Sequence, residues 1–233
     1  MLEEKCIGCK CEGKCDRNPN CPCILRYKHS LIFDYQYHML RNGQKSPYKS
    51  DGTYDFTTHQ IFECSSLCSC NSKCTLRTAQ RGLYCPVVVC SLGDKGLGVM
   101  TTAAIPPGTF VCEYSGEAVT RRSLERQEEQ KQRRTLQRLG SFVTYAIEIN
   151  DKAKEHYVDS EKVGNVSRFF NHSCEPNLRP VKVDRGESMP TLCFFTLTHV
   201  PAGAELTWTY RRGSNVKSGL KCKCGKERCS GYM

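Results

Sequence analysis

The sequence predicts a mostly β protein built from several small sheets, with a cysteine-rich module at each end. Three observations support this fold class. Residues 81–210 hold most of the aliphatic β-forming residues, in short runs separated by Gly and Pro. One stretch in this region, residues 120–139, has a helix-forming composition instead. Thirteen of the eighteen cysteines lie before residue 81 or after residue 211. The short, evenly punctuated runs argue against a parallel α/β fold.

Composition limits the location of the protein and its partners. The 233 residues suffice for one or two domains, and no apolar run approaches the ~20 residues that a membrane span needs. The N-terminus lacks the apolar stretch of a secretory signal, so we expect an intracellular protein. We expect no association with a membrane. The formal net charge of +10 suggests an acidic partner such as nucleic acid, although a merely solvated basic surface explains it equally well.

The cysteines of the first module are more compatible with metal than with disulfides, because intracellular compartments are reducing. Nine of them form two runs, and nine thiols do not divide into isolated four-cysteine sites. They do fit three zinc ions in a triangle, with three bridging and six terminal thiolates. Between the runs, Ile24 to Glu63 is expected to be a loop, and Cys6 is unassigned. The nine ligands are Cys9, Cys11, Cys15, Cys21 and Cys23, then Cys64, Cys68, Cys70 and Cys74.

The negative charge of such a cluster needs compensation. Lys10, Lys14, Arg17, Lys73 and Arg77 are placed in the sequence to provide it. With a fourth zinc site in the tail, thirteen thiolates and four Zn²⁺ would lower the formal charge by five, to +5.

The middle region is expected to form short strands. Val, Ile, Thr, Phe and Tyr fill them, and turns such as Pro106-Pro107-Gly108 separate them. The cysteines within them, Cys85, Cys90, Cys112 and Cys193, are expected to act as small buried hydrophobic residues. The expected strands are Pro86–Cys90, Thr109–Tyr114, Phe142–Ile149, His156–Val158 and Thr191–Leu197.

Residues 120–139 are expected to form a helix, because they are rich in Arg, Glu, Gln, Lys and Leu. Thr120 or Ser123 can cap its start. Leu124, Leu136 and Leu139 give only a thin apolar stripe, so most of the helix should face solvent.

Two motifs point to function. Residues 168–177 read Arg-Phe-Phe-Asn-His-Ser-Cys-Glu-Pro-Asn, and residues 205–210 read Glu-Leu-Thr-Trp-Thr-Tyr. Gly96-Leu97-Gly98 precedes them, and a cysteine triplet follows. In this order, the set closely resembles the signature of SET-domain protein lysine methyltransferases. The nine-cysteine pattern resembles the pre-SET domain of the histone H3 lysine-9 group.

The resemblance implies a SET-domain fold of small β-sheets with a C-terminal pseudoknot and one inserted helix. It divides the chain into a pre-SET zinc-cluster domain at 1–80, a SET catalytic domain at 81–212 and a post-SET zinc segment at 213–233. It also implies that Cys174 completes the fourth zinc site, together with Cys222, Cys224 and Cys229, folding the tail over the active site.

The implied cofactor is S-adenosylmethionine. A lone Gly-x-Gly is more often a turn than a site, and His172 could instead be a core histidine. The motif context favours binding for both. By resemblance, the cofactor-binding residues are Gly96, Leu97, Gly98, Tyr145, Arg168, Asn171 and His172.

The implied reaction is direct methyl transfer to a neutral lysine amine, with no strong base beside it. A narrow apolar channel favours loss of the lysine proton. By resemblance, the catalytic residues are Tyr210, Tyr114 and Tyr145. The lysine channel is lined by Tyr114, Ile147 and Trp208.

Two residues depart from the family pattern. Thr209 stands where Asp is usual, and Trp208 where Phe or Tyr is usual, which leaves the number of methyl groups added open. The implied partners are a histone tail, at lysine 9 of H3, and the nucleosome, with non-specific DNA contact. A nuclear, chromatin-bound monomer is expected. Two alternatives stay open, a non-catalytic chromatin-binding or nucleic-acid-binding SET scaffold and a methyltransferase for a non-histone lysine.

Overall fold

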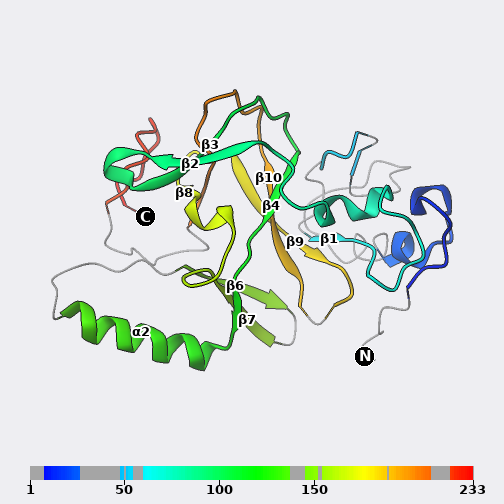
Figure 1. Ribbon diagram of the computed structural model, residues 1–233, viewed down its shortest axis with the longest axis horizontal. Helices are drawn as coiled ribbons and strands as arrows, with labels where there is room; N and C mark the ends of the chain where they lie inside the picture. Colours follow the sequence, from blue (N-terminus) through cyan, green and yellow to red (C-terminus); the bar gives the residue numbers. More distant parts are fainter. Residues whose placement is uncertain are drawn as a thin grey trace. The chain divides into compact units, whose positions relative to one another are not determined.

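The computed structural model describes residues 8–26, 48–49, 51–54, 60–136, 145–151, 154–187, 189–210 and 221–232. Within these residues, short strands dominate and one long helix is present (Figure 1). This confirms the predicted mostly β fold of small sheets. The chain separates into two compact units, each made of segments that are distant in the sequence.

The first unit combines residues 1–84, 106–113 and 180–196. Its sheet has the strand order β1-β9-β10-β4, with β1 (Gln60–Phe62) parallel to β9 (Leu178–Asp184) and β10 (Thr191–Thr196) antiparallel to β4 (Phe110–Glu113). Two 3-10 helices, η1 (Cys15–Arg17) and η2 (Thr75–Gln80), lie in the cysteine-rich part.

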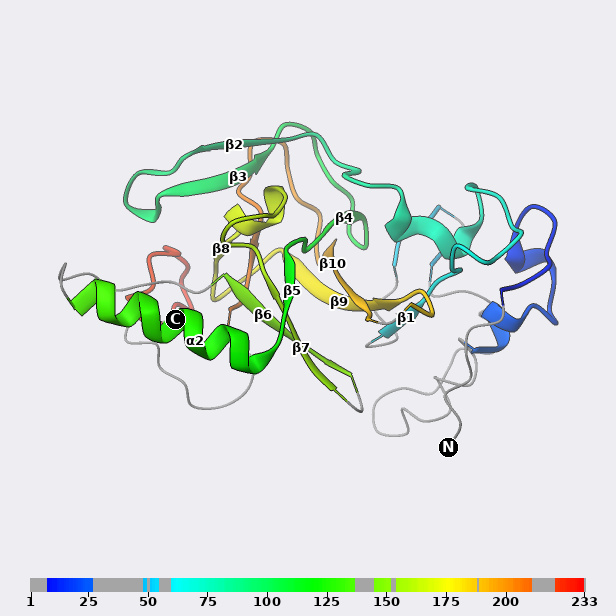
Figure 2. The same cartoon turned by 60° about the horizontal axis from the view of Figure 1, so that its bottom comes forward.

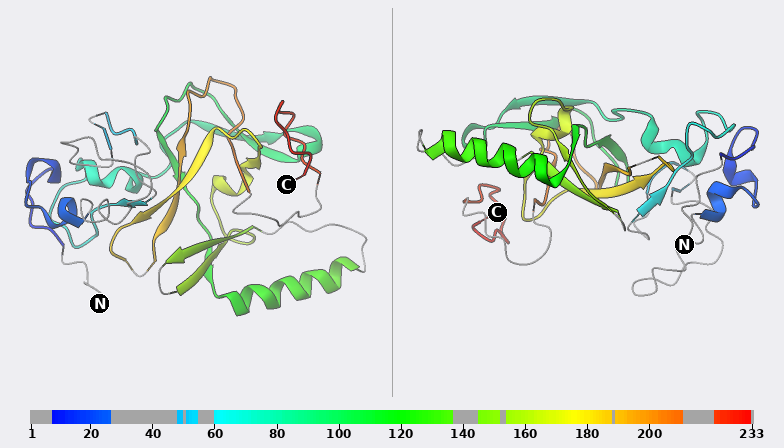
Figure 3. Two further views of the ribbon diagram at one scale, coloured as in Figure 1. Left: turned by 180° about the vertical axis from the view of Figure 1, so that it is seen from behind. Right: turned by 90° about the horizontal axis from the view of Figure 1, so that it is seen from below.

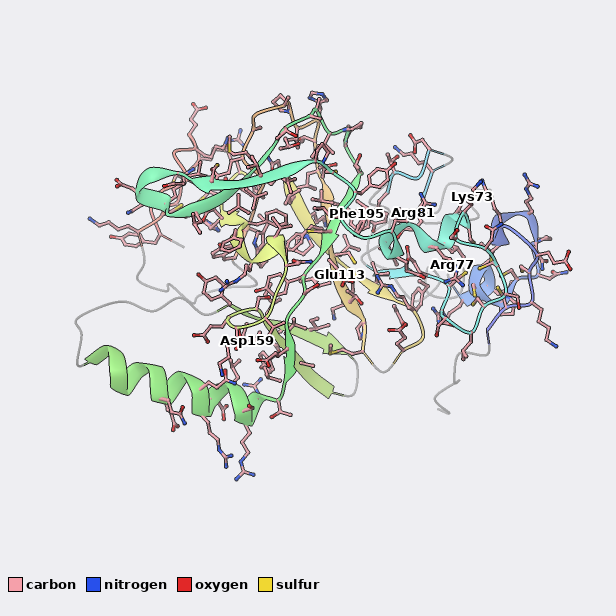
Figure 4. The ribbon with its side chains drawn as sticks, in the orientation of Figure 1. Lys73, Arg77, Arg81, Glu113, Asp159 and Phe195 are labelled. Atoms are coloured by element: carbon pink, nitrogen blue, oxygen red, sulfur yellow. The ribbon has the colours of Figure 1, made fainter. Side chains whose placement is uncertain are left out.

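Phe195, labelled in Figure 4, is the centre of this unit's apolar core. Its ring lies 5.2 Å from that of Tyr54, 5.6 Å from that of Phe110 and 6.3 Å from that of Tyr48, measured between centroids. The cysteines form a second buried cluster with Ile24 and Leu76. Sulfur therefore occupies the interior that apolar side chains would fill elsewhere.

The second unit combines residues 85–105, 114–179 and 197–233. The hairpin of β2 (Val87–Ser91) and β3 (Leu97–Thr101) turns through the 3-10 helix η3 (Gly93–Lys95). A three-stranded antiparallel sheet has the order β5-β7-β6, from β5 (Glu117–Val119), β7 (Lys154–Asp159) and β6 (Ala146–Asp151), and is seen well in Figure 2.

The last strands of this unit are very short. The 3-10 helix η4 (Val166–Phe169) leads into β8 (Asn171–His172), which pairs in parallel with β11 (Thr207–Trp208). Asn171 faces Thr207, and His172 faces Trp208. The two sequence motifs, more than thirty residues apart, therefore lie side by side.

The predicted helix is present as α2 (Arg121–Leu136), the long helix in both views of Figure 3. Thr120 caps it, because its Oγ1 accepts a hydrogen bond from Ser123 N at 3.2 Å. Leu124 is buried, whereas Arg122 and Arg126 face solvent, as expected for a solvated helix. Leu139 lies outside the described residues. No helix among the described residues is long and apolar enough to cross a membrane.

Four of the five predicted strands appear within two residues of their expected bounds. The fifth, expected from Phe142, begins only at Ala146 as β6, and residues 142–144 lie outside the described part. Two expectations were wrong. The expected loop Ile24–Glu63 ends in strand β1, which joins the sheet through its pairing with β9. Cys90 is only half-buried, because its hairpin is solvated, with Val88 45% and Val89 40% exposed. Cys85, Cys112 and Cys193 are buried as predicted.

Candidate active site and zinc centres

The nine cysteines of the first unit converge although the two runs are some forty residues apart. All nine are buried, and Cys9 Sγ lies 3.5 Å from Cys15 Sγ, which lies 3.5 Å from Cys64 Sγ. Three groups of four Sγ atoms each lie within 4.8 Å of one another. These groups are Cys9, Cys11, Cys15 and Cys21; Cys9, Cys23, Cys64 and Cys68; and Cys9, Cys15, Cys64 and Cys70.

Cys74 belongs to the same cluster. Its thiol interacts with those of Cys15 and Cys64, and its Sγ accepts a hydrogen bond from Cys15 N at 3.4 Å. Sets of four convergent thiols are the donor set that Zn²⁺ prefers in structural sites. The residues present therefore fit zinc.

Arg77 shows how positive charge reaches the sulfurs. Its Nε donates to Cys70 Sγ at 3.3 Å, and its guanidinium also donates to the carbonyl oxygens of Ser65 and Cys68, at 2.9 and 3.2 Å. Figure 4 shows Arg77 beside the sulfur atoms. Asn18 Nδ2 donates to Cys11 Sγ at 3.2 Å. Arg77 thus places a positive charge beside Cys70, and Asn18 adds a second hydrogen-bond donor beside Cys11.

A fourth group of sulfurs lies in the second unit. Cys174, Cys222, Cys224 and Cys229 have Sγ atoms within 4.8 Å of one another. Cys174 Sγ lies 3.8 Å from Cys222 Sγ, across 48 residues of sequence. The structure therefore brings the predicted fourth ligand to the tail triplet. Cys6 lies outside the described residues.

Tyr210 follows β11 and is held from two sides. Its hydroxyl donates to Phe170 O at 2.7 Å, and its N–H donates to His172 Nδ1 at 3.1 Å. Its ring packs 5.1 Å from that of Trp208 and 5.4 Å, edge-on, from that of His172. Although 38% of the residue is exposed, burial around the hydroxyl raises its pKa above the ordinary range of a tyrosine. The hydroxyl therefore stays protonated near neutral pH.

Two further tyrosines lie near this hydroxyl. The phenol oxygens of Tyr114 and Tyr145 are close enough to Tyr210 to raise its pKa electrostatically. Tyr114 is 5% exposed, its hydroxyl donates to Tyr145 O, and burial raises its pKa to about 12. Ile147 is buried in β6, two residues after Tyr145. The structure therefore gathers all three predicted catalytic tyrosines.

Arg168 holds a buried hydrogen-bond donor that no described residue satisfies. Its guanidinium carbon lies 4.8 Å from the centre of the Tyr145 ring and 5.0 Å from that of Phe169, and one nitrogen donates to Glu161 O at 2.9 Å. Its Nε is buried and has no hydrogen-bond partner among the described residues. A buried donor without an acceptor is costly, so a carboxylate such as that of S-adenosylmethionine fits here.

The two glycines of the Gly-x-Gly element have different surroundings, because a Cβ on Gly96 would meet nothing within 4 Å whereas one on Gly98 would meet other side chains. Gly96 has φ +79, which favours glycine, and Leu97 is 51% exposed. A Cβ on Gly98 would lie 2.3 Å from Leu92 Cδ1 and 2.8 Å from Asn171 Nδ2. The missing side chain at Gly98 therefore makes room for Asn171 of the protein itself.

Both ring nitrogens of His172 also face protein atoms, so the ring is not available for a polar contact with a cofactor. Nδ1 accepts from Tyr210 N, so Nε2 carries the proton in the neutral ring, and it lies 3.5 Å from Cys174 Sγ. His172 therefore connects Tyr210 to Cys174, a candidate zinc ligand.

Three residues of the site have no role in the sequence-based interpretation, namely Lys95, Asn177 and Glu205. Asn177 Nδ2 donates to Glu205 O at 2.8 Å, and Asn177 Oδ1 accepts from Thr207 N at 2.9 Å. This pair of bonds fixes the backbone that leads into β11. Asn177 and Glu205 end and begin the two motifs, but no spacing rule indicates that they bond to each other.

Comparison with known proteins agrees with this geometry. The SET domain family matches residues 96–211. SUVH5 of Arabidopsis thaliana, described as a histone-lysine N-methyltransferase, H3 lysine-9 specific, is 30% identical over 237 residues, covering 97% of this chain and 26% of SUVH5. The chain thus spans about a quarter of that relative.

Two solved structures share the fold. KRYPTONITE in complex with mCHH DNA, H3(1-15) peptide and SAH has a TM-score of 0.74 and 25% identity, covering 100% of this chain and 44% of the other. The methyltransferase domain of human SETMAR has a TM-score of 0.72 and 28% identity, covering 97% of this chain and 80% of the other. The match extends beyond residues 96–211 to both cysteine modules, and on this basis the chain belongs to the SET-domain family, with relatives that are histone H3 lysine-9 methyltransferases.

Proposed function

We propose that this chain is a protein lysine N-methyltransferase that uses S-adenosylmethionine, and that its substrate is lysine 9 of histone H3. The observation that carries the proposal is the pairing of β8 with β11. This pairing places Asn171 beside Thr207 and His172 beside Trp208, with Tyr210 two residues further along the chain. The relatives named above support the histone substrate, because SUVH5 is specific for H3 lysine 9 and KRYPTONITE binds an H3 peptide.

When bound, the cofactor supplies a methyl group on a positively charged sulfur, which an amine nitrogen can displace. Arg168 Nε would bind the cofactor's carboxylate. The resemblance assigns further contacts to Gly96, Leu97, Gly98, Tyr145, Asn171 and His172. For His172 the contact would come from its backbone, because both ring nitrogens already face protein atoms.

The tyrosines would hold the lysine amine at the reacting position. The raised pKa of Tyr210 and of Tyr114 keeps both hydroxyls neutral, so neither is a general base at neutral pH. They would instead orient the amine's lone pair through hydrogen bonds. Ile147 and Trp208, both buried, would form the apolar wall that favours the uncharged amine. The lysine proton would pass to solvent before the nitrogen–carbon bond forms and the carbon–sulfur bond breaks.

Zinc would organise both cysteine modules without entering the reaction. The recurrence of Cys9, Cys15 and Cys64 in the four-sulfur groups suggests that these three thiolates bridge three zinc ions. The terminal pairs would then be Cys11 with Cys21, Cys23 with Cys68, and Cys70 with Cys74. Cys174 and the tail triplet would bind the fourth ion. Metal binding would replace the apolar core that this part of the chain lacks.

The same proposal covers the wider context. We retain the division into a pre-SET domain at 1–80, a SET domain at 81–212 and a post-SET segment at 213–233. The nucleosome would be the natural substrate, with non-specific DNA contact by the basic surface, and the protein would act as a monomer on nuclear chromatin.

A histone-peptide array tests the proposal directly. Protein supplied with S-adenosylmethionine is incubated with the array, and mass spectrometry reads the site and the number of methyl groups added. Methylation of H3 lysine 9 is expected. Methylation of other proteins alone would favour a non-histone substrate. Cofactor binding in calorimetry without any methyl transfer would favour a non-catalytic scaffold.

A further inference from the structure

Glu205 links three segments of the second unit that are distant in the sequence. Its Oε2 lies 2.8 Å from Lys95 Nζ, and its side chain is only 16% exposed. Its Oε1 accepts a hydrogen bond from Asn171 Nδ2 at 2.9 Å. Asn171 Nδ2 also donates to Leu97 O at 3.1 Å. The Glu205 carboxylate therefore connects η3 with β8, and Asn171 extends the link to the start of β3.

These contacts determine which way the Asn171 amide points. Both neighbours of Asn171 Nδ2, a carboxylate oxygen and a backbone carbonyl, can only accept. The reversed amide would place Oδ1 against two acceptors, so the nitrogen must face them. Both amide protons are then used within the protein. Asn171 can offer a ligand only its carbonyl oxygen, which recognises a donor such as an ammonium group.

The backbone of Glu205 is held firmly enough to transmit this constraint. Asn177 fixes both sides of Leu206, as described above. Glu205 also forms a β-bridge with Met100, and Leu206 N donates to Val99 O at 2.8 Å. The carboxylate therefore has a fixed origin, and Lys95 restrains its far oxygen.

We propose that Glu205 is a positioning residue for the cofactor site, acting through Asn171. The charge of Glu205 strengthens its bond to the Asn171 amide, because hydrogen bonds to an ionised acceptor are stronger than neutral ones. Lys95 keeps the carboxylate turned toward Asn171. Glu205 itself does not touch the cofactor. This inference rests on the proposed function only in identifying the ligand as S-adenosylmethionine.

The test is calorimetric binding of S-adenosylhomocysteine, which needs no turnover. Native protein is compared with Glu205→Gln, Lys95→Met, Asn171→Ala and the Glu205→Gln/Asn171→Ala double variant. Lys223→Met is the matched control, because Lys223 Nζ donates to Asp94 O of the same turn at 2.8 Å without reaching Glu205. Circular dichroism and melting temperature verify that each variant is folded.

Glu205→Gln is expected to raise Kd about tenfold, since a neutral amide makes a weaker bond and turns an N–H₂ toward Lys95. Lys95→Met should raise it about threefold, because partly exposed ion pairs contribute little. In the Asn171→Ala background, Glu205→Gln should change Kd less than twofold, since coupled residues are non-additive. Lys223→Met should bind within twofold of native protein. In turnover, Glu205→Gln should raise KM for S-adenosylmethionine while kcat stays within threefold.

Three results would overturn the positioning role: an unchanged Kd in folded Glu205→Gln, an equal effect of Glu205→Gln with and without Asn171, or a fall in kcat with KM unchanged. If native protein itself fails to bind S-adenosylhomocysteine, the proposed function fails instead. The two failures are therefore distinguishable. Should Glu205→Gln not fold, Lys95→Met alone decides, and an unchanged Kd there counts against the proposal.

Discussion

Replacing Tyr210 with phenylalanine removes one oxygen atom from the centre of the candidate site. In the native protein this hydroxyl donates to the backbone oxygen of Phe170 at 2.7 Å, and Phe170 is only 1% exposed. A buried hydrogen bond of this kind contributes about 1 kcal/mol to stability. For a chain of this length, Tyr210→Phe should therefore lower the melting temperature by only about 2–4 °C. The fold should persist.

The effect on the reaction should be larger. The same hydroxyl would orient the reacting amine, and one hydrogen bond to a group that bears charge during transfer is worth about 1.5–3 kcal/mol. Each 1.36 kcal/mol changes a rate tenfold, so kcat should fall by about ten- to a hundredfold. S-adenosylhomocysteine binding should change little, because the tyrosine ring and its contacts with Trp208 and His172 remain.

The assay is transfer of a labelled methyl group to an H3 peptide, with calorimetric S-adenosylhomocysteine binding in parallel. Tyr84→Phe is the matched control, since Tyr84 is 60% exposed and lies in the first unit. It should keep native turnover. A folded Tyr210→Phe variant with native kcat would remove the hydroxyl from the mechanism. A variant that loses cofactor binding as well would show that the hydroxyl supports the site instead of the chemical step.

Three further predictions follow from the same geometry. Elemental analysis of protein purified without chelator should give four zinc ions per chain, and a content of one or two would contradict the bridged cluster. The Cys174→Ser variant should lose one zinc ion and most of its activity. The control variant Cys90→Ser should keep all four zinc ions. The value of kcat/KM should rise from pH 7 to 9, because free lysine has a pKa of about 10.4. The pKa of Tyr114 is raised to about 12 and that of Tyr210 is also raised, so both phenols stay protonated there and no falling limb should appear. Gly98→Ala should weaken S-adenosylhomocysteine binding at least tenfold, since its Cβ would displace Asn171, and native affinity in calorimetry would show that the amide need not stay in place.

Several features of this protein could be predicted from local sequence because local chemistry controls them. The helix from Arg121 needs only a capping threonine and good helix-forming residues, and both are visible in the sequence. The nine candidate zinc ligands of the first module follow from counting, because tetrahedral Zn²⁺ restricts how many thiols a site can use. Tyr210, Asn171 and Arg168 are identified by motif order, which is preserved whatever the exact fold.

Other features depend on contacts between distant segments. Strands β8 and β11 have two residues each, too few to leave a periodic signal, and only their pairing brings the two motifs together. Strand β1 forms because β9, more than a hundred residues later, supplies its hydrogen-bond partners.

The same holds for individual side chains. Asn171 and Glu205 belong to the two motifs and Lys95 directly precedes Gly96, but nothing in the sequence indicates that these three side chains meet. The distances of 2.8 Å between Lys95 and Glu205 and 2.9 Å between Asn171 and Glu205 arise when η3, β8 and the segment before β11 meet. Which thiols lie close enough to share a metal ion likewise depends on the positions of sulfurs from two distant runs. Residue types and local spacing therefore determine the available chemistry, whereas long-range backbone pairing decides which groups meet, because a hydrogen bond depends on distance in space and not on separation along the chain.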